Sequence, residues 1–236
     1  MWRRFGRRLL HAVLVLAAVV VLALAAGVVY VATLPSVANA PARVQRILDA
    51  HQGTYGRPPV PPKLGDSLVA VEDEHFYDNF AINILTGAGR AAIATLDASS
   101  DPGGSTIPQQ LAKLLYGRGS SVGATLREIG LGIRLSLRYS KPQILDLYLN
   151  AAYFGNGYWG YVAAARGYFD TSPQRLDWAQ AAMLAGLPQA PSAYDPLRHY
   201  ALAKQRQQHV LDQLVANHYL TRSQADAAFR EPLRLR

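Results

Sequence analysis

Apolar residues recur along most of this chain with the spacing of an α-helix, one at every third or fourth position. The alternation of apolar and polar residues that is typical of a half-buried strand is scarce. The helical repeat predicts helices over residues 107–116, 125–139, 142–150, 176–187, 200–216 and 223–230. We therefore predict a mainly α-helical domain.

The N-terminal part has a different pattern, an apolar run from Ala12 to Ala32 that contains no charged residue. At ~1.5 Å per residue, this run spans roughly the 30 Å of a bilayer's hydrocarbon core. A cleaved signal peptide would have a shorter apolar region, of about 7–15 residues. We therefore predict a retained transmembrane helix over residues 9–34. The arginines of residues 1–8 predict a cytoplasmic basic tail, with the remainder of the chain outside.

Prolines mark the segment that follows the predicted membrane helix. They are Pro35, Pro41, Pro58, Pro59, Pro61 and Pro62. A short helical pattern from Val44 to Ala50 interrupts them. Because proline restricts backbone hydrogen bonding, we predict a stiff linker over residues 35–63 and a folded domain over residues 64–236.

The charge of the chain is modest once the tail is set apart. The formal net charge is +8, but four of the 24 basic residues lie in the tail, which leaves 20 against 16 acidic residues. This excess lacks the concentrated basic stripe of a nucleic-acid binder, and it is compatible with an anionic ligand or lipid surface. The absence of cysteine excludes a disulfide framework and a Cys-based metal or redox site.

Two glutamates are candidates for acid–base chemistry. Glu72 directly follows the apolar stretch 69–71, and Glu128 lies within the apolar repeat of the predicted helix 125–139. Two carboxylates that face one cleft are the minimum equipment for chemistry at a sugar's anomeric centre. The alternative is that each glutamate lies on a solvated helix face, which is the commoner situation.

A second candidate is the glycine-rich start of the predicted helix 107–116. The stretch Gly103-Gly104-Ser105-Thr106 offers free N–H groups and a helix dipole to an anion. Gln109, Gln110 and Lys113 lie within about one turn of each other, and amides suit sugar hydroxyls as lysine suits phosphate. The lysine is not placed as in a P-loop. The alternative is an ordinary capped helix with a polar face.

Three other motifs give weaker or no evidence for a functional site. Residues 155–160 match G-x-G-x-x-G, but they follow a helical pattern instead of a strand and lie outside the membrane, so we predict a loop whose aromatic residues could stack on a sugar. Glu72-x-x-His75 is a single E-x-x-H, whereas a di-metal bundle site needs two. The serine motifs of acyl transfer are missing.

Taken together, these stretches resemble the peptidoglycan glycosyltransferases, which comprise monofunctional enzymes and the transglycosylase module of class A penicillin-binding proteins. The resemblance runs from about Leu64 to Ala228 and rests on the order and spacing of many segments. These are residues 72–76, 103–107 with 109–113, Glu128, 140–141 with 144–145 and 148–150, 153–155, 163–165 with 168–169, 184–188, 190–191 and 195–196.

The resemblance implies a lysozyme-like, two-lobed helical fold and a single-pass protein of the bacterial cytoplasmic membrane. It implies lipid II as substrate, which would be polymerised with inversion into β-1,4-linked glycan while undecaprenyl diphosphate leaves. No further module follows Arg236, so the resemblance implies a monofunctional version. Expected partners are lipid II, the growing glycan chain, the membrane and other cell-wall synthesis proteins, with no nucleic acid.

The resemblance also implies roles for individual residues. Glu72 corresponds to the general base, and Glu128 to the acid beside the departing diphosphate, where a divalent cation (Mg²⁺ or Mn²⁺) is the candidate metal. The cations expected to neutralise charge are Lys113, Arg118 and Arg127. The side chains expected to position sugars or support the cleft are Ser105, Thr106, Gln109, Gln110 and Asn150. Asp73 and Phe76, which share the motif of Glu72, are also expected at the substrate.

This chain departs from the family's pattern at Asn79, Ala81, Pro108, Ala124 and Thr125. The last two positions normally carry an Arg-Lys pair before the second glutamate, and losing both cations would weaken donor binding. A degenerate member that binds glycan or a cell-wall partner without turnover is therefore one alternative. A lysozyme-like enzyme that cleaves glycan is another.

Overall fold

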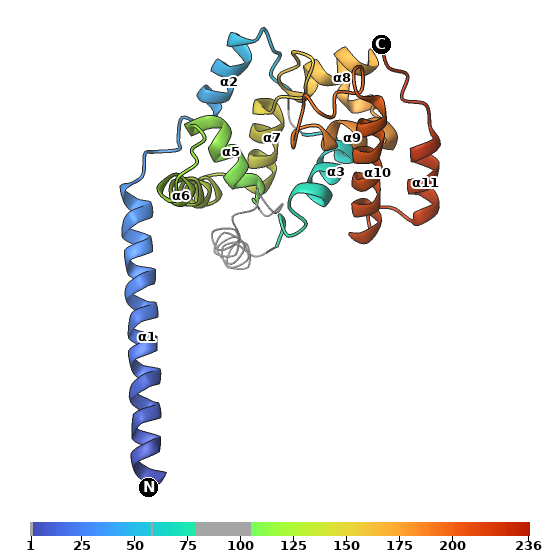
Figure 1. Cartoon of the computed structure of the whole chain (residues 1–236). Helices are drawn as coiled ribbons and strands as arrows, with labels where there is room; N and C mark the ends of the chain where they lie inside the picture. Colours follow the sequence, from blue (N-terminus) through green and yellow to red (C-terminus); the bar gives the residue numbers. More distant parts are fainter. Residues whose placement is uncertain (1, 58, 79–104) are drawn as a thin grey trace. The chain divides into compact units, whose positions relative to one another are not determined.

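The computed structural model describes residues 2–57, 59–78 and 105–236 of the chain. Within these ranges the regular structure is helical, apart from an isolated antiparallel bridge between Tyr153 and Trp159. The helices are α1 (Trp2–Thr33), α2 (Ala40–Ala50), α3 (Pro62–Glu72), α5 (Ile107–Tyr116), α6 (Val122–Arg138), α7 (Lys141–Ala151), α8 (Tyr161–Phe169), η1 (Pro173–Arg175), α9 (Trp178–Gly186), α10 (Tyr200–Ala216) and α11 (Arg222–Arg230) (Figure 1). The prediction of a mainly α-helical chain is confirmed.

The chain divides into two compact units, residues 1–36 and residues 37–236. The first unit is built on α1. Its segment Leu10–Thr33 is long and apolar enough to cross a membrane. This helix is consistent with the predicted single-pass membrane anchor.

The second unit begins earlier than the sequence suggests. The predicted linker contains α2, whose apolar residues Ala40, Val44 and Leu48 are fully buried, and α2 packs against α7. Val37, just before α2, is buried as well. The density of prolines is misleading here because a proline in the first turn of a helix is tolerated, so the apolar spacing decides the structure.

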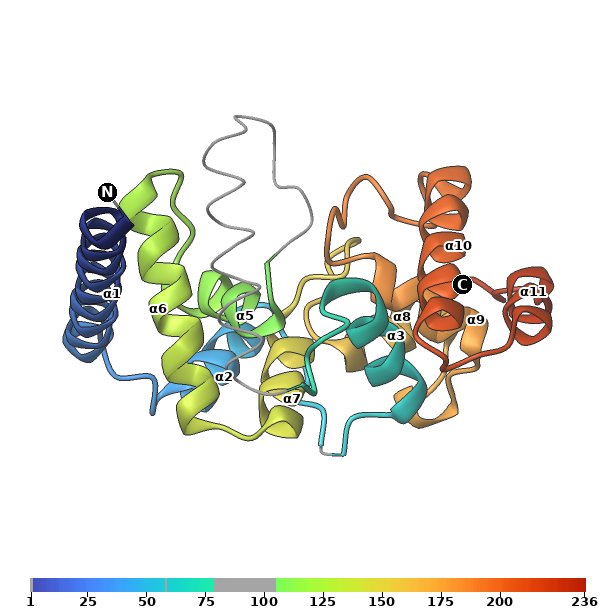
Figure 2. The same cartoon turned by 90° about the horizontal axis from the view of Figure 1, so that it is seen from below.

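The helices of the second unit form two groups (Figure 2). In the first group α5 packs on α6 and α7, and α2 packs on α7. In the second group α3, α9 and α10 pack on one another, while α11 covers α10. Contacts between α7 and α8 join the groups. The predicted two-lobed helical domain is thus present, and its likeness to lysozyme stays a prediction.

The centres of both groups are helices that are apolar nearly all round. Helix α7 buries every residue from Ile144 to Ala151, and α9 buries every residue from Ala179 to Gly186. Such helices belong in a core because they have no solvent-facing side. The helices α5, α7, α9 and α11 each begin with a capping box that has glutamine at its third position. These fixed starts position the polar residues of α5 that are described next.

Candidate functional site

Glu72 ends α3 at the place where the two groups of helices meet. Its Oε1 lies 3.2 Å from a terminal guanidinium nitrogen of Arg206 on α10, and its Oε2 accepts a hydrogen bond of 2.7 Å from the amide of Gln110 on α5. The Glu72 and Arg206 side chains are only 10% and 11% exposed. A carboxylate has about four lone-pair positions, so Glu72 can still accept a proton from a further group.

Arg206 is held in place by the end of α9. Its Nε donates to the backbone oxygen of Gly186 at 3.2 Å. A Cβ atom at Gly186 would lie 2.8 Å from Cγ of Arg206, so the glycine makes room for this side chain. Burial lowers the pKa of the Arg206 guanidinium, while the charge of Glu72 acts in the opposite direction. The charge of Glu72 therefore offsets part of the cost of burying the guanidinium.

Gln110 is fixed from its other side by Tyr148 of α7, whose hydroxyl donates to the amide oxygen at 2.9 Å. Burial and the charge of Glu72 raise the pKa of Tyr148 well above its ordinary value. The phenol therefore stays protonated and acts as a donor. Four helices, α3, α5, α7 and α10, thus fix the position of the Glu72 carboxylate.

The start of α5 is organised by its own residues and by Asp73. The Asp73 carboxylate accepts a hydrogen bond of 3.0 Å from the backbone N–H of Ile107, the first residue of the helix. The side chain of Gln109 accepts from the backbone N–H of Thr106 at 3.1 Å, within the capping box. Asp73 is buried. In this structure it therefore supports the helix start, and its expected contact with a substrate stays a prediction.

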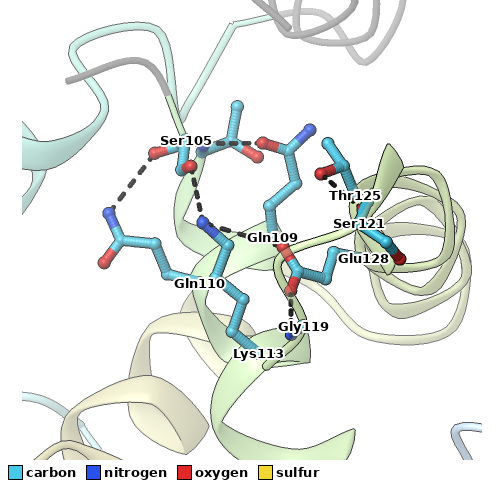
Figure 3. Close-up of polar contacts among 9 residues, drawn as sticks. Ser105, Gln109, Gln110, Lys113, Gly119, Ser121, Thr125 and Glu128 are labelled. Atoms are coloured by element: carbon cyan, nitrogen blue, oxygen red, sulfur yellow. Dashed lines mark hydrogen bonds and ion pairs between the residues drawn. The ribbon is translucent and has the colours of Figure 1, made fainter. Parts of the chain in front are cut away.

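The second carboxylate, that of Glu128 on α6, lies beside Lys113 of α5 (Figure 3). Lys113 donates to the hydroxyl of Ser105 at 3.0 Å, and its Nζ lies 3.8 Å from Oε2 of Glu128 on α6. The other Glu128 oxygen accepts a hydrogen bond of 3.4 Å from the backbone N–H of Gly119. The side chains of Lys113 and Glu128 are 19% and 9% exposed.

These contacts join the two glutamates through one polar face of α5. Gln110 donates to Glu72 and also, at 3.3 Å, to the backbone oxygen of Ser105. The hydroxyl of Ser105 accepts from Lys113, which pairs with Glu128. The predicted residues Ser105, Gln110 and Lys113 are therefore brought together with both carboxylates. Residues Gly103 and Gly104, which the sequence places just before them, lie outside the described residues.

Close packing of α5 and α6 sets the distance between Lys113 and Glu128. A Cβ atom at Gly132 would lie 3.1 Å from the backbone nitrogen of Gln109, which is tighter than most Cβ contacts. The glycine therefore lets the two helix backbones approach. Since Glu128 lies one turn before Gly132 on the same face of α6, this approach directs Glu128 toward α5.

The predicted arginines lie elsewhere. Arg118 and Arg127 are both exposed, and among the described residues no contact joins either to Lys113 or Glu128. For Arg127 this agrees with the rotation of about 100° per residue that separates it from Glu128. Thr125 occupies the position of the missing family lysine, and its hydroxyl donates to the backbone oxygen of Ser121 at 3.3 Å. The departures at Asn79 and Ala81 lie outside the described residues.

Two expected substrate contacts are core residues. Phe76 is fully buried, with the Lys141 ammonium 4.7 Å from its ring centre. Asn150 is fully buried as well, and its side chain bonds to the backbone of Gly56 and to Asp146. Neither can touch a sugar in this structure. Phe76 supports the end of α3, and Asn150 ties the α2–α3 connection to α7, which is the support that the expectation for Asn150 included.

The remaining motifs do not add to this site. The loop 155–160 contains Gly155, Gly157 and Gly160 at positive φ, as predicted for a loop. Its Trp159 is stacked on His51 at 4.2 Å between ring centres and lies against Tyr153 at 4.9 Å. Both neighbours occupy ring surface that a stacked sugar would need.

The candidate metal position beside Glu128 has few possible ligands among the described residues. In the described part of the chain no group of three or more His, Asp or Glu residues could hold a metal ion. The Glu128 carboxylate already faces the Lys113 ammonium. Among the described residues, one carboxylate with a neighbouring cation supplies too few oxygen ligands for a resident divalent ion, which needs several.

Sequence reasoning missed Arg206 and Tyr148. Arg206 lies 134 residues from its partner Glu72, so no local spacing connects them. A signal was nevertheless present in α10, because Arg206 shares a helix face with the buried residues Ala203 and Val210. An arginine on an apolar face is rarely buried without a partner.

The sequence of this chain is similar to those of known transglycosylases and penicillin-binding proteins. A family model described as Transglycosylase matches residues 42–215. A Cupriavidus necator protein that carries the name transglycosylase is 39% identical over 178 residues, which cover 75% of this chain and 77% of that protein. Penicillin-binding protein 2a of Streptococcus pneumoniae is 39% identical over 183 residues, which cover 77% of this chain and 24% of that protein.

Among solved structures, the crystal structure of penicillin-binding protein 1A from Haemophilus influenzae is similar with a TM-score of 0.48 and 23% identity. The match covers 78% of this chain and 18% of that one. This chain therefore spans about a quarter or less of the penicillin-binding proteins that it matches.

Proposed function

This chain belongs to the transglycosylase family, and we propose that it polymerises lipid II into β-1,4-linked peptidoglycan strands with release of undecaprenyl diphosphate. The family resemblance predicted from the motifs is thereby confirmed, and it supports a glycosyl transfer. The observation that carries the proposal is the continuous polar path from Glu72 through Gln110, Ser105 and Lys113 to Glu128.

Glu72 acts as the general base in this proposal. Its carboxylate takes the proton of the acceptor's 4-hydroxyl as that oxygen attacks C1 of the donor sugar. The new C1–O bond forms on the face opposite the departing diphosphate, so the configuration inverts. Arg206 and Gln110, at 3.2 and 2.7 Å, are positioning residues that hold the carboxylate in one orientation. Fixed orientation matters because a small misplacement of a catalytic group reduces the rate strongly.

The leaving diphosphate is assigned to the other end of the path. The bond from C1 to the diphosphate oxygen breaks, and the electron pair leaves with the diphosphate. Among the described residues Lys113 is the cation that pairs with Glu128, at 3.8 Å, and it stabilises the negative charge that develops there. Glu128 holds this ammonium in place. No step of the mechanism passes through a metal ion, in keeping with the ligand set described above.

The chain acts at a membrane in this proposal. Helix α1 anchors it to the bacterial cytoplasmic membrane, with the N-terminus in the cytoplasm and residues 37–236 outside. A tether is useful for this reaction because the lipid-borne substrate is confined to the same surface.

Incubation of the full chain with labelled lipid II, followed by separation of the products, tests the function. We expect glycan polymers that lysozyme digests, together with free undecaprenyl diphosphate. Lipid II that is bound but unchanged would instead indicate a degenerate member. The missing cations at Ala124 and Thr125 are the reason to consider this alternative. Fragments released from finished peptidoglycan, without polymer, would indicate a glycan-cleaving enzyme.

A further inference from the structure

A cavity of about 630 Å³ lies away from the two glutamates. It is bounded by the connection between α2 and α3, the first turns of α3, and the start of α7. Its volume falls within the range of ligand-binding pockets, roughly 300–1,000 Å³. Neither Glu72, Lys113, Glu128 nor Arg206 lines it, so the proposed reaction does not use it.

The walls of the cavity are prolines, aliphatic residues and three tyrosines, Tyr55, Tyr77 and Tyr139. The hydroxyl of Tyr139 donates to the backbone oxygens of residues 37 and 38, and the hydroxyl of Tyr55 lies 3.4 Å from Asp146. These contacts fix two rings by their polar ends. Tyr77 is 54% exposed, so the third ring is accessible from solvent.

Two carboxylates, Asp66 and Asp146, also line the cavity. Asp146 is hydrogen-bonded by Tyr55 and Asn150. Within the described residues neither aspartate forms an ion pair, and the lining residues include no lysine or arginine. The cavity thus carries negative charge without a cation of its own.

The environment of Asp66 agrees with this description. Burial raises the pKa of the Asp66 carboxyl. Burial, and next the charge of Asp66, raise the pKa of Tyr77 and of Tyr219. A carboxylate that is half-desolvated beside aromatic rings is a position where a bound cation would be favoured.

We propose that this cavity docks an extended, proline-containing peptide segment of a partner protein, with one arginine of the segment against Asp66 and the tyrosine rings. Grooves lined by aromatic residues bind the preformed polyproline II conformation, because little entropy is lost on binding. The planar guanidinium can pair with a carboxylate and stack on a ring at once. The same carboxylates disfavour an anionic lipid, which separates this surface from the proposed substrate site.

The test uses the full chain in detergent micelles and two synthetic proline-rich peptides that differ only in one residue, arginine or glutamine. We expect the arginine peptide to bind about three- to fivefold more tightly than the glutamine peptide. The substitution Asp66→Asn should abolish that difference, and Tyr77→Ala should weaken both peptides. The matched control Asp226→Asn, on α11, should leave both affinities unchanged.

Thermal unfolding of each variant shows that a loss of binding does not reflect a loss of fold. Equal affinities of the two peptides for the unaltered chain, or an unchanged preference after Asp66→Asn, would overturn the proposal. So would the absence of any peptide binding. Methylguanidinium is the third probe, and if it binds as tightly as the arginine peptide, the cavity is a site for small cations and not for a peptide.

Discussion

Glu72 and Arg206 form an ion pair that is about nine-tenths buried on both sides. Such a pair contributes little net stability compared with a well-packed apolar pair, but removal of one partner leaves the other charge buried and alone. Substitution of either residue alone is therefore expected to destabilise the fold. It also means that the orientation of the proposed base depends on a helix far away in the sequence.

The substitution Arg206→Met tests this dependence. Breaking a buried pair costs about 3–5 kcal/mol, so we expect the free energy of unfolding to fall by about 3 kcal/mol. The double variant Glu72→Gln/Arg206→Met should lose less than the sum of the two single variants, because no charge is then left unpaired. Denaturant unfolding of the four proteins measures this coupling.

Activity separates a positioning role from a merely structural one. We expect Arg206→Met to lower kcat about tenfold to a hundredfold with little change in KM, and Arg206→Lys to recover part of the loss. If Arg206→Met unfolds more easily but keeps its kcat when folded, Arg206 only supports the fold.

Thr125 is the position from which a cation could act beside the other carboxylate, Glu128. It lies three residues before Glu128 on the same face of α6, and it replaces a lysine of the family's pattern. A charge-assisted hydrogen bond contributes about 1.5–3 kcal/mol, so Thr125→Lys should raise the affinity for lipid II about tenfold. Thr125→Met, which has similar length and no charge, is the control in the same binding assay. An equal gain in affinity for lipid II in both variants would show that the gain does not come from the added charge.

At the scale of the elements, the approach of α5 and α6 depends on Gly132. Gly132→Ala places a methyl group 3.1 Å from the backbone of Gln109, and overpacking of this kind costs about 1–3 kcal/mol. We expect lower stability and a lower turnover, because Lys113 and Glu128 are moved apart. Gly123→Ala on the same helix has nothing nearer than 3.9 Å, and it should be neutral or stabilising by up to about 1 kcal/mol. Equal effects of the two substitutions in thermal unfolding and turnover assays would contradict this account.

Helix positions were predictable wherever the apolar spacing was regular. The structure has α5 and α10 with the predicted bounds, 107–116 and 200–216, and the other helices predicted after residue 107 differ by up to three residues at either end. Helix α2 extends four residues before the predicted helical pattern 44–50, because the prolines around it hide the spacing of its three buried apolar residues. Helix α3 was not predicted, since only its last apolar residues before Glu72 were noticed.

The candidate site was predictable only where its residues are close in the sequence. Gln110 and Lys113 share one face of α5 and Ser105 lies just before the helix, so local spacing brings the three together. Tyr148 reaches Gln110, and Arg206 reaches Glu72, only through the packing of α7 and α10, which periodicity does not reveal. Burial also changes the interpretation of a polar residue, since Asp73 and Asn150 have the chemistry of ligands but serve as internal hydrogen-bond partners.

At the scale of the whole molecule, the division at residue 36 predicts that the anchor and the folded unit are separable. A variant that lacks residues 1–34 should keep the thermal unfolding midpoint of the full chain. On lipid II in vesicles its turnover should fall by roughly a hundredfold, because the tether no longer raises the effective concentration at the membrane. In detergent micelles the two proteins should differ little. Equal turnover in vesicles would show that α1 does not bring the unit to its substrate.

The central claim is that Glu72 accepts the proton of the attacking hydroxyl. The most direct measurement is the rate of lipid II polymerisation by Glu72→Gln, at saturating lipid II and with binding of lipid II measured in parallel. The account predicts a fall of about 10²–10⁴-fold in turnover, with binding largely retained in a folded protein. Polymerisation by the folded Glu72→Gln variant at a rate near that of the unaltered chain would contradict it.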